Sequence, residues 1–238
     1  MTSSKKTRVA HYRFPKPITI ADIDRNAEKR IALVSKEFRC GFDFIKKYPK
    51  SVTIFGSSMI TEADPYYRKA VRFGAAVAKI GYAVVTGGGP GIMEAANRGA
   101  FKAGGASVGL NIKLPHEQRP NRYLTDAIEF HYLFSRKVML SFAAEAYVFF
   151  PGGYGTLDEF FEIITLVQTN RIHMPIPLIL FGKSFWQPMD KIIKKVLLEK
   201  NHTIGRNDAK LYCIEDDTAK ILRIIQSAPI VETIPFKH

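Results

Sequence analysis

Two glycine-rich turns are the segments of this chain whose residue types and spacing best suit chemistry. The first (residues 87–91, Gly-Gly-Gly-Pro-Gly) follows an apolar run at 82–86, and the second (151–156, Pro-Gly-Gly-Tyr-Gly-Thr) follows one at 146–150. A buried strand that ends in glycines and opens a helix leaves backbone N–H groups pointing outward. Together with the positive end of the helix dipole, these groups suit a phosphate. Two such turns in one domain predict an anionic ligand of nucleotide size.

Three acidic residues, Asp158, Glu159 and Glu162, lie in the first turns of the helix that we predict after the second glycine turn. Cleavage of an N-glycosidic bond develops positive charge on the ribose, and a carboxylate beside the ring stabilises that charge. Thr156 and Glu159 also have the spacing of a capping box, in which Glu159 would only bind the N-terminus of its own helix. The spacing alone leaves the two interpretations of Glu159 equally open.

Other chemistries lack their signatures. Ile92 occupies the place of the third glycine of a dinucleotide fingerprint, and the next predicted strand ends at Asn111 rather than at an acid for the ribose hydroxyl. Neither turn continues into the Gly-Lys-Ser/Thr of a Walker loop. The six histidines are scattered, and nothing around Lys137 marks it for a Schiff base. Zinc, iron and pyridoxal chemistry are therefore disfavoured.

The elements that must position these residues alternate along the chain. The pattern predicts strands at 51–55, 82–86, 107–112, 128–131, 146–150, 176–181 and 212–214. It predicts helices at 24–47, 65–80, 91–103, 134–144, 157–169, 185–199 and 217–225. Short strands that are apolar on both faces and alternate with helices indicate an α/β fold, with a mainly parallel sheet covered by helices on both sides. Such sheets bind ligands at the carboxyl ends of their strands, where both glycine turns fall.

Length and charge suggest three parts. The 238 residues suit one nucleotide-binding α/β domain at 51–228, preceded by a partly helical basic extension at 1–50 and followed by a tail at 229–238. Residues 1–50 contain 13 Lys and Arg against 5 Asp and Glu, so they supply most of the formal charge of +13. A solvated helix face is the favoured explanation. Nucleic acid is disfavoured as a partner, because no zinc, helix-turn-helix or RNA-binding motif accompanies the charge.

The sequence also predicts a cytoplasmic protein. No apolar run approaches the roughly 20 residues that cross a bilayer, so we expect no membrane partner. The N-terminus lacks the apolar segment of a secretory signal. Cys40 and Cys213 lie far apart and lack metal-type spacing, so we expect both to be reduced thiols.

Residues 87–97 (GGGPGIMEAAN) and 151–159 (PGGYGTLDE) together resemble the LOG ("lonely guy") family, whose members are often mislabelled lysine decarboxylases. Residues 114–118 with Asn121, and Arg136-Lys137 with Met139, are similar to further signatures of one bacterial branch. The resemblance covers about residues 38–225. It implies a Rossmann-like fold, at least a homodimer with sites near the subunit interface, and a reaction without metal or organic cofactor.

The resemblance also implies an activity. Characterised members hydrolyse nucleoside 5′-monophosphates to free base and ribose 5-phosphate, some preferring cytokinin riboside monophosphates and others AMP or a wider range. By resemblance, Arg136 and Glu159 are the catalytic residues, which favours the functional interpretation of Glu159. Gly152, Gly153, Gly155 and Thr156 would hold the phosphate. The other predicted substrate-binding residues are Ser57, Gly88, Gly89, Gly91, Met93, Glu94 and Lys137.

Several alternatives stay open. Arg136 has two possible roles. It contacts the substrate, where it would steady the phosphate or polarise the leaving base, or it is a solvated residue near the start of a helix. Glu94 has a simpler role available as an acid at a helix N-terminus. The polar loop with Gln118, Asn121 and Arg122 either covers the ligand or is solvated. The chain as a whole could be a non-catalytic nucleotide or molybdenum-cofactor carrier, although the presence of both predicted catalytic residues favours an enzyme. The long basic N-terminus departs from the short plant-like members.

Overall fold

The sheet of this computed structural model is parallel throughout. The structure describes residues 19–113, 120–172 and 176–229, and in them seven strands pair in the order β4-β3-β2-β1-β5-β6-β7. The strands are β1 (Ser51–Phe55), β2 (Ala83–Thr86), β3 (Ser107–Ile112), β4 (Asp126–Phe130), β5 (Ala146–Phe149), β6 (Leu178–Leu180) and β7 (Cys213–Ile214). The chain winds outward from β1 to β4, then crosses over to β5 on the other side of β1. This reversal of strand order lies between β1 and β5, and open α/β sheets bind ligands at such a point.

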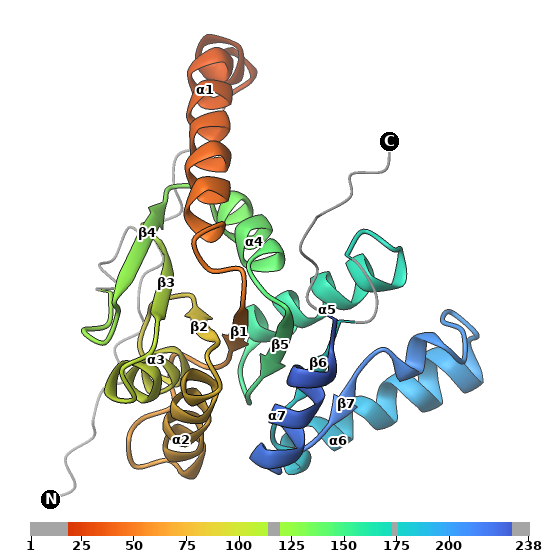
Figure 1. Ribbon diagram of the computed structural model, residues 1–238. Helices are drawn as coiled ribbons and strands as arrows, with labels where there is room; N and C mark the ends of the chain where they lie inside the picture. The colour runs from red at the N-terminus through yellow and green to blue at the C-terminus, as the bar shows by residue number, and fades with distance from the viewer. Residues whose placement is uncertain (1–18, 114–119, 173–175, 230–238) are drawn as a thin grey trace, which may run out of the picture.

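The helices cover both faces of the sheet (Figure 1). They are α1 (Ile20–Ile45), α2 (Pro65–Lys79), α3 (Ile92–Lys102), α4 (Leu133–Phe142), α5 (Tyr154–Gln168), α6 (Lys183–Ile192) and α7 (Thr218–Ser227). A π-helix, η1 (Ile193–Lys200), continues α6, and a short 3₁₀ turn, η2 (Asp208–Lys210), follows. One core cluster joins the sheet to α2, α3 and α7, and the other joins it to α1, α4, α5 and α6.

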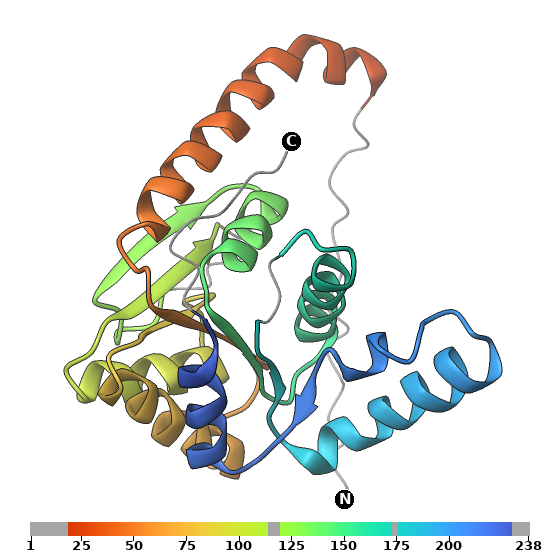
Figure 2. The same ribbon diagram turned by 45° about the vertical axis from the view of Figure 1, so that its right-hand side comes forward.

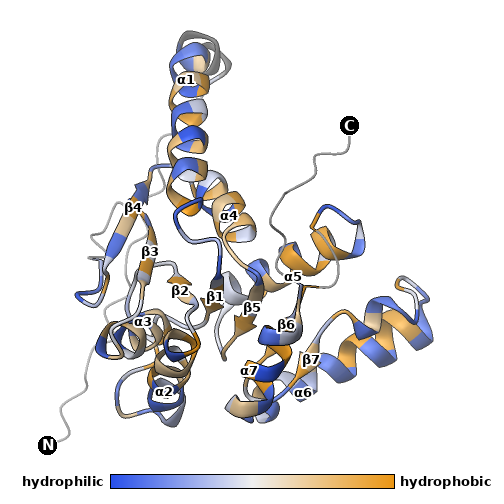
Figure 3. Cartoon of the chain, viewed as in Figure 1, coloured by the Kyte–Doolittle hydropathy of each residue, from blue (hydrophilic) through white to orange (hydrophobic). Residues whose placement is uncertain are grey.

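Alternation along each strand fills these two cores. Val84 and Val148 belong to the α2 side, whereas their neighbours Val85 and Phe149 belong to the α4 side, as the two-residue period of a strand requires. All four side chains are buried. In Figure 3 the inner strands β3 and β5 are accordingly orange, whereas the edge strand β4 includes hydrophilic residues. The runs were apolar on both faces because both faces are covered.

Helix α1 leaves the body of the molecule. Its N-terminal half extends away from the sheet, whereas its C-terminal half lies against α4 (Figures 1 and 2). Phe44 belongs to the core shared with α4, and Met139 of α4 fills the space beside Gly41. The buried carboxylate of Glu37 accepts hydrogen bonds from the backbone N–H groups of His131 and Tyr132, which immediately precede α4. The basic extension is therefore helical from residue 20 and is packed onto the helix that carries Arg136.

The predicted α/β class with a parallel sheet is confirmed, with several boundaries corrected. The helix after the second glycine turn begins at Tyr154 rather than at 157, and α6 begins at Lys183 rather than at 185. Strand β4 begins at 126 rather than 128, and β6 is confined to 178–180. Glycines at 153 and 155 suggested a turn, but the start of a helix tolerates them. The division into three parts stays a prediction, and residues 1–18 and 230–238 lie outside the described residues.

Within the described parts of the chain, we find no helix with the length and apolar character needed to span a membrane.

Candidate functional site at the two glycine turns

The backbone of Ser57, in the loop after β1, connects the two glycine turns. Its N–H donates to the carbonyl oxygen of Pro151 at 3.0 Å, and its own carbonyl oxygen accepts from the N–H of Ile92 at 3.0 Å. Its hydroxyl oxygen accepts from the N–H of Met59 at 3.0 Å. Because β1 lies between β2 and β5, the turns meet at the carboxyl edge of the sheet, as the sequence predicted for them. Ser57 therefore joins the turns, and a contact of Ser57 with substrate stays a prediction.

The first glycine turn requires its glycines. Gly88 and Gly91 have φ angles of +71° and +74°, which disfavour other residues. A Cβ atom on Gly91 would also overlap the carbonyl oxygen of Ser57. Gly88, Gly89 and Gly91 are buried, so the turn is held rigidly where α3 begins.

A network of buried polar side chains supports the first glycine turn. Asn121 donates from its backbone N–H to the Gly88 carbonyl oxygen at 2.9 Å and from its side chain to the Gly89 carbonyl oxygen at 3.2 Å. Thr86 donates to Asn97 and accepts from the Gly88 N–H. Asn121 is buried and supports the turn, so the alternative of a solvated residue is wrong for it, and its covering of a ligand stays a prediction. Gln118 and the signature at 114–118 lie outside the described residues.

The second glycine turn opens α5 directly. Gly153 is the N-cap residue of α5 and makes no side-chain cap, so the capping-box interpretation of Thr156 and Glu159 is wrong. A Cβ atom on Gly153 or Gly155 would meet nothing within 4 Å, and both glycines are exposed. Thr156 is buried, and a Cβ atom on Gly152 would overlap its hydroxyl. The N-terminus of a 15-residue helix thus lies open beside two glycines, which suits an anion.

Glu159 and Arg136 lie together beside these turns. Burial raises the pKa of the Glu159 carboxyl to about 7, while the positive charge of Arg136 opposes that rise. Burial lowers the pKa of Arg136, and Glu159 opposes this shift in turn. An arginine keeps its charge in proteins. The pair therefore offers a permanent cation next to a carboxyl group that gains or loses its proton near neutral pH.

Contacts from distant parts of the chain fix Arg136. Its Nε donates to the carbonyl oxygen of Leu110, on β3, at 2.8 Å. A Cβ atom on Gly87 would overlap a terminal nitrogen of the guanidinium and approach the sulfur of Met93 to 2.9 Å. The group is thus enclosed by β3 and the first glycine turn, which contradicts its alternative as a solvated basic residue.

Lys137 contacts acids rather than open space. Its Nζ lies 2.7 Å from Oδ2 of Asp158 and 3.3 Å from Oε2 of Glu162, and it is largely buried. Burial lowers the pKa of Lys137, but the two carboxylates outweigh this and raise it. Lys137 therefore neutralises the two acids that flank Glu159. Its predicted contact with substrate stays a prediction.

Glu94 and two asparagines complete the surroundings. Glu94 accepts a hydrogen bond from the hydroxyl of Tyr67 at 3.1 Å, so it is bound to α2. Asn97 and Asn111 are buried, and sequence reasoning assigned them no role. Among the described residues, Asn111 Oδ1 has no hydrogen-bond partner and lies where a side chain on Gly88 would be. An asparagine inside a helix, such as Asn97, was the available signal, since it is a poor helix former.

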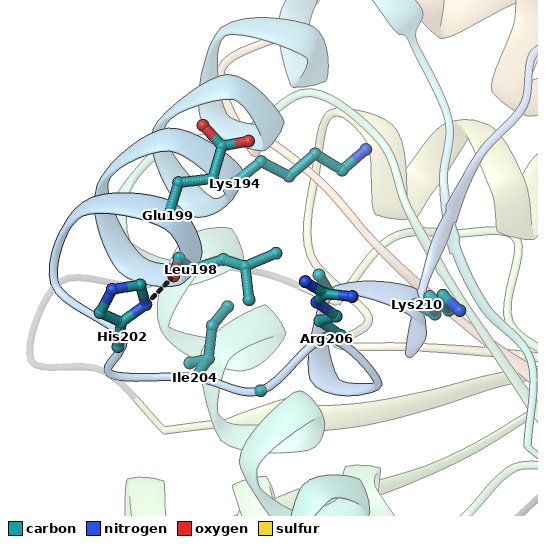
Figure 4. Close-up of a pocket in the computed structure, with 9 residues that line it drawn as sticks. Lys194, Leu198, Glu199, His202, Ile204, Arg206 and Lys210 are labelled. Carbon is teal, nitrogen blue, oxygen red and sulfur yellow. Dashed lines mark hydrogen bonds between the residues drawn. The ribbon is translucent and has the colours of Figure 1, made fainter.

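A large cavity lies elsewhere, between η1 and the segment that follows it (Figure 4). Its volume is about 900 Å³. It is lined by Lys194, Leu198, Glu199, His202, Ile204, Gly205, Arg206, Ala209 and Lys210. Lys194 is paired with Asp190 at 2.9 Å, and His202 Nδ1 lies 3.0 Å from the Leu198 carbonyl oxygen. None of the predicted site residues lines this cavity, so the cavity is not part of the glycine-turn site.

Within the described ranges, no three His, Cys, Asp or Glu side chains gather in a group able to hold a metal ion.

Comparison with known proteins places this site in a family. The chain is 28% identical over 171 residues to a cytokinin riboside 5′-monophosphate phosphoribohydrolase of Rhodococcoides fascians, covering 69% of this chain and 84% of that protein. It is 32% identical over 133 residues to the probable cytokinin riboside 5′-monophosphate phosphoribohydrolase LOGL5 of Oryza sativa subsp. japonica, covering 55% and 54%.

Solved structures share the fold. The molybdenum cofactor binding protein of Rippkaea orientalis has a TM-score of 0.57 at 20% identity, over 75% of this chain and 96% of that one. The X-ray structure of TM1055 has a TM-score of 0.57 at 27% identity, over 74% and 98%. The family model described as "Possible lysine decarboxylase" matches residues 93–225, which include Arg136 and the second glycine turn. With the resemblance of its motifs thus confirmed, the chain belongs to this family, the LOG proteins.

Proposed function

We propose that this protein hydrolyses the N-glycosidic bond of nucleoside 5′-monophosphates, releasing the free base and ribose 5-phosphate. AMP and cytokinin riboside monophosphates are the proposed substrates. One observation carries the proposal. A carboxyl group with a pKa of about 7 lies beside a largely buried arginine and within the first two helical turns after the open N-terminus of α5. Relatives named phosphoribohydrolases support the same activity.

The phosphate binds at the second glycine turn in this proposal. The backbone at Gly153 and Gly155 is open, and the α5 dipole attracts an anion to it. Glu159 lies six residues beyond Gly153 on the same helix, so a phosphate held at the N-terminus leaves the ribose near this carboxylate. The permanent charge of Arg136 supplies a second contact, either to the phosphate or to the leaving base.

The reaction then requires only water. As the bond between C1′ and the base nitrogen breaks, its electron pair leaves with the base and the ribose gains oxocarbenium character. The Glu159 carboxylate stabilises this charge. Water adds its oxygen to C1′, and the proton it loses balances the one that the base gains. Burial strengthens the electrostatic effect because little solvent screens the two groups.

A product assay tests the proposal. The protein is incubated with AMP, CMP, GMP and UMP, and free base and ribose 5-phosphate are quantified by chromatography. Glu159→Gln is expected to lower kcat about 10²- to 10³-fold, because it removes the charge that stabilises the transition state. Glu199→Gln, the same change in the remote cavity of Figure 4, serves as the matched control and keeps full activity. Normal turnover by Glu159→Gln would exclude the assigned role.

The second candidate is a non-catalytic nucleotide or molybdenum-cofactor carrier. The observation in its favour is the shared fold with the molybdenum cofactor binding protein of Rippkaea orientalis and the carrier protein of Chlamydomonas reinhardtii, at 20% and 19% identity. The same assay separates the candidates, since a carrier binds nucleotide tightly in calorimetry and releases no base. The pairing of Glu159 with Arg136 favours the enzyme, because mere binding of an anion gains nothing from a nearby carboxylate.

A further inference from the structure

A second, strongly basic cavity lies between α2 and α3, separate from the glycine turns. Its volume is about 400 Å³, within the range of small-molecule sites. The lining residues are Glu62, Tyr67, Arg68, Val71, Arg72, Arg98 and Lys102. Arg68 and Arg72 are four residues apart on α2, and Arg98 and Lys102 are four apart on α3. Each helix therefore directs a pair of cations from one of its faces into the same space.

Two of these cations are held in place by the protein. Arg98 forms an ion pair with Glu62 at 2.8 Å, and its own side chain is largely buried. Arg68 donates to the carbonyl oxygen of Ala63 at 2.9 Å. These contacts fix two guanidinium groups at the cavity wall, so their geometry exists before any ligand arrives.

The other two cations lack such contacts. Arg72 and Lys102 are exposed, and neither has a hydrogen-bond or ion-pair partner among the described residues. Four cationic side chains and one carboxylate line the cavity, leaving an excess of three positive charges. Like charges at helical spacing repel one another, and folding gains nothing from gathering them here.

We propose that this cavity binds a compound carrying two or more linked phosphate groups. Guanidinium groups match phosphate oxygens with paired N–H donors, and a lysine adds a mobile point charge. A diphosphate supplies about the negative charge needed to offset the excess. The site is distinct from the nucleotide site proposed above, because it is built on the outer helices rather than at the carboxyl edge of the sheet.

Calorimetric titration of the full chain with inorganic pyrophosphate, and separately with ADP, tests this site. Arg72→Ala/Lys102→Ala removes the two cations that have no structural partner. Arg30→Ala/Lys79→Ala is the matched control, because it removes one exposed arginine and one exposed lysine away from the cavity. Thr156→Val alters the second glycine turn. Thermal melting of each variant confirms folding, and the same chain is titrated with a single-stranded oligonucleotide.

We expect the cavity variant to lose the pyrophosphate-binding event or to weaken it about tenfold or more. The matched control and Thr156→Val should stay within about threefold of the unmodified chain. Of the binding that the cavity variant loses, a stronger component for ADP than for pyrophosphate would identify a nucleoside diphosphate as the preferred form, and the reverse would identify the free anion. Equal binding by the cavity variant, equal loss in the matched control, loss in Thr156→Val, or binding of the oligonucleotide alone would each overturn the proposal.

Discussion

Turnover of AMP should increase steeply with pH as Glu159 loses its proton. The carboxylate form is the one that stabilises an oxocarbenium ion, and burial raises the pKa of this carboxyl to about 7. At pH 5.5 only about 3% of the side chains are ionised, against about 90% at pH 8, so kcat should differ roughly thirtyfold across this range. An ordinary glutamate would already be ionised at pH 5.5 and would give a nearly flat profile.

Two variants assign the midpoint of the profile to Glu159. Lys137 lowers the pKa of Glu159 and Asp158 raises it. Lys137→Met should therefore move the midpoint to higher pH, and Asp158→Asn should move it to lower pH. A phosphate monoester loses its second proton at about pH 6. Neither substitution alters that ionisation, so opposite shifts cannot come from the substrate.

The assay is kcat at saturating AMP between pH 5 and 9, with free adenine as the readout. Melting curves at each pH confirm that the chain remains folded. A flat profile, or a midpoint that stays in place in both variants, would refute the assignment of the ionisable group.

Two further predictions concern the same pair of residues. Gly87→Ala should lower kcat at least tenfold with little loss of stability, because the new methyl group takes the space of the Arg136 guanidinium; unchanged kinetics would mean that the guanidinium does not act where it lies. Glu159→Gln should raise the free energy of unfolding at pH 8 by up to roughly 3 kcal/mol, measured by urea denaturation. The raised pKa makes ionisation above pH 4.5 costly to the folded state, so this gain should vanish at pH 4; an equal gain at both pH values would contradict the electrostatic origin.

Local patterns were sufficient for much of the fold and for the meeting of the two glycine turns at the carboxyl edge of the sheet. Both glycine turns follow strands that are apolar on each face, and such strands alternating with helices indicate a covered parallel sheet. Glycine is a weak helix former, so the sequence pattern predicts the start of α5 three residues too late, although the N-terminus of a helix tolerates glycine.

The environment of the proposed catalytic pair, Arg136 and Glu159, could not be derived from spacing. Arg136 binds the carbonyl oxygen of Leu110, 26 residues away in sequence, and its guanidinium occupies the space beside Gly87. Burial of Glu159 depends on the same tertiary packing, and burial is what raises its pKa. Periodicity describes one element at a time, so it contains no information about which side chains meet when the elements pack.

The hydrogen bonds of Glu37 restrict where this chain can be truncated. Composition marks residue 50 as the natural place to trim, since the basic stretch ends there and the first strand follows. A cut at that point would delete the carboxylate that accepts hydrogen bonds from the backbone N–H groups of His131 and Tyr132, the two residues just before α4. The arginine three residues further along that helix would then lie in a segment with a frayed start. A shortened chain therefore has to retain the C-terminal half of α1, and only the part that extends beyond the body is available for removal or for fusion to another protein.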